Sequence, residues 1–131
     1  MASIRKEMVV ACAPEKAWDA ARDIGAPHTR LVRGFVADCK LEDGARTITF
    51  ANGMIAREVI VDIDDSARRL VWSASAGRLT HHNASLQIFF EGAGKSRIVW
   101  IADLLPDAMR APIDAMIQQG MDAMKKTLEA G

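Results

Sequence analysis

Residues 106–131, PDAMRAPIDAMIQQGMDAMKKTLEAG, contain the pattern that decides the fold. Pro112 fits best in the first turn of a helix, so a regular helix is expected to begin near it. Lys125 and Lys126 lie near its C-terminal end, where positive charge is favoured. The apolar residues recur three or four positions apart and define one helix face: Met109, Ile113, Met116, Ile117, Gly120, Met124 and Leu128.

A helix with one apolar face must pack against another element, and the preceding sequence predicts a sheet. Period-two alternation predicts strands at residues 4–12, 34–42, 46–50, 54–63, 69–75, 81–91 and 96–104. Asn52-Gly53 is the strongest hairpin signal, because both residues tolerate positive φ. Pro14 opens a short helix that runs from Glu15 to about Asp23.

Short turns between strands require antiparallel neighbours. The expected fold is therefore α+β: a curved antiparallel sheet of about six to seven strands wraps around the long C-terminal helix, with one or two short helices after the first strand. Residues 1–131 are expected to form one domain. Curvature can leave a gap between the sheet and the helix, and this gap is the candidate pocket.

The alternation also predicts which strand residues face the helix, while His81 and Asp103 are expected to point outward. The predicted inward residues are Phe35, Cys39 and Leu41; Ile55, Arg57, Val59, Val61 and Ile63; Leu70 and Trp72; His82, Leu86, Ile88 and Phe90; and Ile98 and Trp100.

The amino-acid composition narrows the classes of function that this chain can have. Seventeen acidic and 17 basic residues give a net charge of zero, so no strong field favours nucleic acid or an anionic membrane. No apolar run approaches a membrane span or resembles a signal peptide. Cys12 and Cys39 form no CxxC pair, which predicts free thiols and a cytoplasmic location.

Motifs of cofactor enzymes are missing: the sequence has no Gly-rich phosphate loop, zinc-ligand spacing, dinucleotide fingerprint or Ser-His-Asp signature. No cofactor and no metal are therefore expected.

Several stretches resemble a known superfamily. They are APEKAW at 13–18, DGART at 43–47, LTHHNASLQ at 79–87, RIVWIAD at 97–103 and the helix that follows Pro106. Their order is similar to that of the SRPBCC superfamily, the helix-grip group that includes START domains, and most closely to its bacterial polyketide cyclase/dehydrase-like branch. The resemblance covers almost the whole chain and implies a fold and a cavity, but no reaction.

Two residues are candidates for polar or catalytic roles. An inward His82 would serve as a hydrogen-bond partner or general acid/base at the pocket mouth; the alternative is a strand-edge histidine with a local partner. An inward Arg57 would clamp a ligand carboxylate or enolate, because a buried arginine needs a partner. The alternative is that Arg57 reaches water at its strand end.

Apolar candidates complete the predicted site. Trp72 and Trp100 either wall a flat ligand or fill the core, and Trp18 is expected to pack its own helix. Cys39 is expected to be an inert core thiol. The full ligand-binding prediction is Phe35, Cys39, Arg57, Val59, Trp72, His82, Leu86, Trp100, Met109, Ile113, Met116, Ile117, Gly120 and Met124.

Three functions remain open at this point. The first is binding of a small hydrophobic, aromatic or lipid-like molecule in the pocket. The second is an enzyme of the cyclase or dehydrase type, in which His82 and Arg57 act on a polycarbonyl substrate. The third is a regulatory or stress-type protein whose pocket tunes a partner interaction. The sequence is compatible with a monomer or a homodimer.

Overall fold

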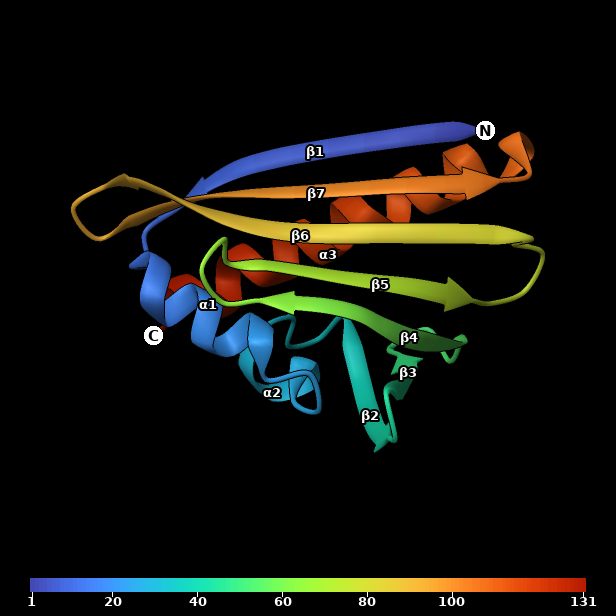
Figure 1. The fold of residues 1–131 in the computed structure, drawn as a ribbon, viewed down its shortest axis with the longest axis horizontal. Coiled ribbons are helices and arrows are strands. Elements are labelled where there is room, and N and C mark those ends of the chain that lie inside the picture. The colour runs from blue at the N-terminus through green and yellow to red at the C-terminus, as the bar shows by residue number, and fades with distance from the viewer.

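A computed structural model describes residues 1–131, and its strands form one seven-stranded antiparallel sheet (Figure 1). Three helices and one 3₁₀ turn complete the chain, so the predicted α+β fold is confirmed. The elements are β1 (Ala2–Val10), α1 (Pro14–Arg22), α2 (Pro27–Arg30), β2 (Val36–Glu42), β3 (Ala45–Phe50), β4 (Ile55–Asp64), β5 (Arg69–Ser75), β6 (His81–Gly92), β7 (Lys95–Leu105), η1 (Asp107–Met109) and α3 (Arg110–Glu129).

The strand order β1-β7-β6-β5-β4-β3-β2 puts consecutive strands side by side except at β1, which pairs with the last strand. β1 and β2 are therefore the two edges, and α1 and α2 connect them. In Figure 1, α3 lies behind the sheet, and β2 and β3 run at a steep angle to β5, β6 and β7. This change of direction is the twist expected of a large sheet, and it makes the face toward α3 concave.

The long helix α3 packs its apolar face onto the sheet, as the spacing predicted. Its buried side chains include Ile113, Ile117 and Met124. Polar contacts join its exposed side to β1: Lys6 Nζ lies 2.8 Å from Asp114 Oδ1. None of the helices combines the length and the apolarity needed to cross a membrane.

The prediction of which β4 side chains point inward is wrong for the first half of the strand. Ile55 is 59% exposed and Val59 is 41% exposed, whereas Ala56 and Glu58 are buried. Arg57 accordingly lies on the outer face, where its Nε is 3.9 Å from Glu42 Oε1.

The β3–β4 turn explains this error. A two-residue Asn52-Gly53 turn would pair Arg57 with Ile48, but the actual turn also includes Ala51, because Phe50 N donates to Met54 O at 2.8 Å. Arg57 then pairs with Thr47. One extra turn residue moves every side chain of the following strand to the other face.

Bulges cause further departures from strict alternation. A bulge between Ile60 and Asp62 leaves Val61 exposed and returns Ile63 to the core, as predicted for Ile63. A second irregularity, between Val36 and Asp38, leaves Val36 buried. An extra residue in one strand breaks the period of two, which local alternation cannot show.

Two predicted inward residues near strand ends are also exposed. Leu41 lies at the end of edge strand β2 and is 58% exposed. Phe90 is 69% exposed, because the β6–β7 hairpin extends beyond the helices that cover the sheet (Figure 1). More than half of each side chain is therefore left in contact with solvent.

Candidate functional site

A largely apolar cavity lies between the concave face of the sheet and α3. Its volume is about 90 Å³, it is partly open, and 14 of its 18 lining residues are hydrophobic. The lining comes from α2, the segment after it, six of the strands and α3: Pro27, Leu31, Val32, Phe35, Val36, Arg46, Ile48, Phe50, Glu58, Leu70, Trp72, His82, Leu86, Trp100, Ile113, Met116, Ile117 and Met124.

A buried ion pair forms part of the cavity wall. Arg46 and Glu58 face each other across β3 and β4, and Arg46 Nε donates to Glu58 Oε1 at 2.9 Å. The two residues are only 6% and 9% exposed. Arg46 Nη1 also donates to the carbonyl of Ile24 at 3.1 Å. Burial raises the pKa of Glu58, and Arg46 offsets part of this effect.

Two further polar atoms on the cavity wall have no hydrogen-bond partner. They are Nε2 of His82 and Nε1 of Trp100, and both are buried. Burial, with a smaller contribution from His81, lowers the pKa of His82 below its usual 6.5. The imidazole is therefore neutral at neutral pH and can accept or donate one hydrogen bond at Nε2. Buried polar groups are normally paired, so these two atoms are candidates for ligand contacts.

Aromatic rings form the rest of the wall. Trp72 and Trp100 pack edge to face with ring centroids 5.9 Å apart, and Phe35 packs against Phe50 in the same way at 5.2 Å. Gly120 of α3 lies directly behind two of these rings: a Cβ atom there would lie 2.8 Å from the Trp100 ring and 3.1 Å from Phe35. The missing side chain of Gly120 lets the helix approach the aromatic wall closely.

The structure brings most of the predicted ligand-binding residues to this cavity. Nine of them line it: Phe35, Trp72, His82, Leu86, Trp100, Ile113, Met116, Ile117 and Met124. Gly120 packs against the rings of Trp100 and Phe35 and does not itself line the cavity. Met109 lies in η1, outside the lining.

Three other predicted residues do not line the cavity. Arg57 and Val59 are on the outer face of the sheet, so Arg57 follows the alternative in which its side chain reaches water, and the inward clamp does not form. Cys39 lies against the carbonyl of Ile24, with its Sγ 3.6 Å from that oxygen. Burial raises the pKa of the Cys39 thiol, with Arg46 opposing the effect, so the thiol is protonated at neutral pH.

Sequence reasoning missed Arg46 and Glu58, the only oppositely charged pair in the cavity wall. A signal for the pair existed, because the two residues are equidistant from Asn52 in the hairpin. A three-residue turn centred there pairs them directly, whereas a two-residue turn does not. No group of three or more histidine, cysteine, aspartate or glutamate side chains is close enough to hold a metal ion.

The curved sheet, the long helix and the apolar cavity between them define a helix-grip protein. A family model described as polyketide cyclase / dehydrase and lipid transport matches residues 1–129. The chain belongs to this family, which confirms the resemblance found in the sequence. Membership implies hydrophobic-ligand binding or cyclase activity in general terms and names no ligand.

Solved structures share the fold at low sequence identity. The XoxI protein from Bacillus cereus is 17% identical with a TM-score of 0.87, covering 98% of this chain and 96% of that one. A START superfamily protein from Mycobacterium smegmatis is 13% identical with a TM-score of 0.70, covering 98% and 94%.

A biosynthetic protein shares the fold as well. The di-domain ARO/CYC protein BexL, from the BE-7585A biosynthetic pathway, is 12% identical with a TM-score of 0.81; the match covers 98% of this chain and 47% of BexL. No curated protein matches the sequence. At these identities the likeness extends to the fold alone.

Proposed function

We propose that this protein binds a small hydrophobic, ring-shaped molecule in the cavity between the sheet and α3. The observation that carries the proposal is the cavity itself, which is apolar over most of its wall and has a few polar atoms at defined positions. Ligand sites in proteins have this composition: apolar surface supplies affinity and a few polar groups fix orientation.

The size of the cavity supports a small ligand. A volume of about 90 Å³ is well below the roughly 300–1,000 Å³ typical of sites for drug-sized molecules. It is also below the roughly 150 Å³ of an engineered cavity that accepts benzene. We expect a single ring to fit after small side-chain adjustments, and larger ligands to require movement of flexible lining residues such as Met116 and Met124. Methionine is suited to such movement, because its side chain is flexible and unbranched.

A cyclase or dehydrase activity is the second candidate. Glu58 and His82 both line the cavity and both have shifted pKa values, which is a feature of acid–base sites. In the sequence-based hypothesis, His82 and Arg57 were the two residues that act on the substrate. In the structure, Glu58 rather than Arg57 lines the cavity together with His82. A polycarbonyl chain exceeds the volume of the cavity, so this activity ranks below binding of a small molecule.

Other predictions from the sequence remain predictions. Free thiols at Cys12 and Cys39 agree with a cytoplasmic location. The exposed edges at β1 and β2 are compatible with a monomer or a homodimer. One ligand-binding domain over residues 1–131 agrees with the continuous sheet.

Toluene binding followed by NMR tests the first proposal. Three tryptophan indole N–H signals are available, and Trp18 serves as an internal reference because it lies outside the cavity and bonds to Asp65. Toluene is expected to shift the Trp72 and Trp100 signals and to leave that of Trp18 unchanged. If no signal shifts, or all three shift equally, the proposal is wrong.

A matched pair of methionine variants tests where the ligand sits. Met116 and Met109 are both partly buried, but only Met116 lines the cavity. Met116→Ala is expected to admit the two-ring probe naphthalene, because it enlarges the cavity, whereas Met109→Ala is not. Equal naphthalene binding by both variants would place the ligand elsewhere.

A further inference from the structure

Three charged or titratable side chains of the cavity wall lie in a single row of the sheet. Arg46 of β3 pairs with Glu58 of β4, and Glu58 pairs with Ala74 of β5. The next residues beyond the registered pair Ser73–Asn83 are Ala74 and His82. Arg46, Glu58 and His82 therefore lie in line on the inner face, and we call these three residues the polar row.

The polar row keeps unused hydrogen-bonding capacity. Glu58 accepts one hydrogen bond, from Arg46 to Oε1, and its Oε2 has no partner. His82 Nε2 is buried and also has none. The backbones of Glu58 and His82 are two strand spacings apart, about 10 Å. Only the methyl group of Ala74 stands between them in this row, so both side chains can meet one ligand group.

We propose that the ligand carries a neutral hydroxyl group that donates to Glu58 and contacts His82 Nε2, while its apolar ring packs against the aromatic wall. This inference rests on the proposed binding function and adds the chemical class of the ligand: a small phenol-like molecule.

The charges of the polar row favour a hydroxyl over an ion. Glu58 already compensates Arg46, so a carboxylate ligand would bring an unbalanced negative charge next to Glu58 in a largely apolar cavity. A hydroxyl carries no net charge, and it donates and accepts at the same atom. It therefore satisfies the carboxylate oxygen and the neutral imidazole nitrogen together.

Trp100 carries another polar atom of the cavity wall, away from the polar row by register. Its Nε1 is also unpaired, but Trp100 pairs with Leu86, four residues along β6 from His82. This separation is about 13 Å along the strand. By register, the backbone of Trp100 therefore lies outside the polar row.

The test compares phenol, toluene and benzoate, three one-ring probes, by NMR titration at neutral pH. The wild-type protein is expected to bind phenol about tenfold or more tightly than toluene, as one hydrogen bond to a charged group provides, and benzoate more weakly than phenol. His82→Phe is expected to reduce the preference for phenol and keep toluene binding. His81→Phe, a control at the neighbouring exposed position outside the cavity lining, is expected to keep the preference.

A second variant avoids the risk that loss of Glu58 alone unfolds the protein. The paired variant Arg46→Met/Glu58→Leu removes both charges and replaces them with side chains of similar size. It is expected to lose most of the preference for phenol and to keep toluene binding.

Each other outcome overturns a specific part of this account. Equal binding of phenol and toluene by the wild type, or a preference that survives both His82→Phe and the paired variant, overturns the hydroxyl assignment and leaves the binding function standing. If benzoate binds more tightly than phenol, the hydroxyl assignment is also overturned, and the result points to an anionic ligand. Failure of both toluene and phenol to bind overturns the binding function as well.

Discussion

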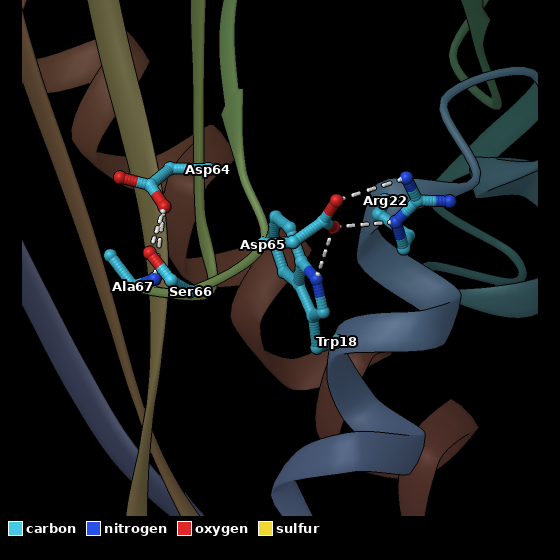
Figure 2. A network of polar contacts seen from close by, with 6 residues as sticks. All are labelled: Trp18, Arg22, Asp64, Asp65, Ser66 and Ala67. Atoms are coloured by element: carbon cyan, nitrogen blue, oxygen red, sulfur yellow. Dashed lines mark hydrogen bonds and ion pairs between the residues drawn. The ribbon is translucent and has the colours of Figure 1, made fainter.

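Two clusters in the molecule each combine an arginine, a carboxylate and a tryptophan, one at the surface and one in the cavity wall. At the surface, Asp65 accepts hydrogen bonds from Arg22 Nε at 2.7 Å and from Trp18 Nε1 at 2.9 Å. Figure 2 shows both side chains of α1 converging on this carboxylate, which lies in the β4–β5 turn. The hydrogen bonds from Arg22 and then Trp18 lower the pKa of Asp65. This cluster attaches α1 to the sheet.

The interior cluster uses the same residue types with the opposite effect. Arg46 and Glu58 are buried, and the guanidinium carbon of Arg46 lies 6.0 Å from the centroid of the Trp72 ring. Here burial dominates and raises the pKa of Glu58. Because removing two charges from water costs several kcal/mol per ion, a buried pair adds little to stability. The comparison indicates that the surface cluster joins α1 to the sheet, whereas the interior cluster belongs to the binding site that we propose.

The largest expected loss of stability comes from removing only one partner of the Arg46–Glu58 pair. Glu58→Leu leaves Arg46 charged and buried, and it is expected to lower the free energy of unfolding by about 3–5 kcal/mol. The paired variant Arg46→Met/Glu58→Leu is expected to be as stable as the wild type or more stable. Urea denaturation at pH 7 measures both. Equal losses in the two variants would mean that packing, not the unpaired charge, is responsible.

The opposite pKa shifts predict opposite responses to pH. Folded Glu58 holds its proton at a higher pH than the unfolded chain, so its contribution makes the protein less stable as pH rises from about 4.5 through the raised pKa. Asp65 has a lowered pKa, so its contribution is lost as pH falls below 3.8. Urea midpoints across pH, compared with those of the paired variant and of Asp65→Asn, separate the two effects. Parallel pH profiles for the wild type and the paired variant would contradict the assignment to Glu58.

The smallest expected loss of stability comes from changing the carboxylate of the surface cluster. Asp65→Asn removes the charge and weakens the bond to Arg22, so the urea midpoint at pH 7 is expected to fall slightly, far less than with Glu58→Leu. The difference from wild type should shrink in 1 M salt, because exposed charges are screened. Asp62→Asn, a control without a charged partner, is expected to change nothing. A loss comparable to that of Glu58→Leu would refute the surface assignment.

The placement of the candidate site could be predicted only in part. Trp72, Trp100 and His82 were predicted correctly to face the cavity, because β5, β6 and β7 keep strict alternation there. Arg57 and Val59 were assigned to the wrong face, because one additional turn residue shifts the register of β4. Turn length depends on the pairing of both strands, so local pattern alone did not specify it.

The sequence by itself determined the class of fold. The apolar spacing of residues 109–128 and the alternating strands before it require a helix on an antiparallel sheet, since these periods decide which side chains can be buried together. Only the tertiary structure decided the chemistry of the cavity. Arg46 and Glu58 are 12 residues apart in the chain, and they become neighbours across the cavity wall through the register of one hairpin. Burial then shifts the pKa of Glu58, and burial exists only once all the layers have packed.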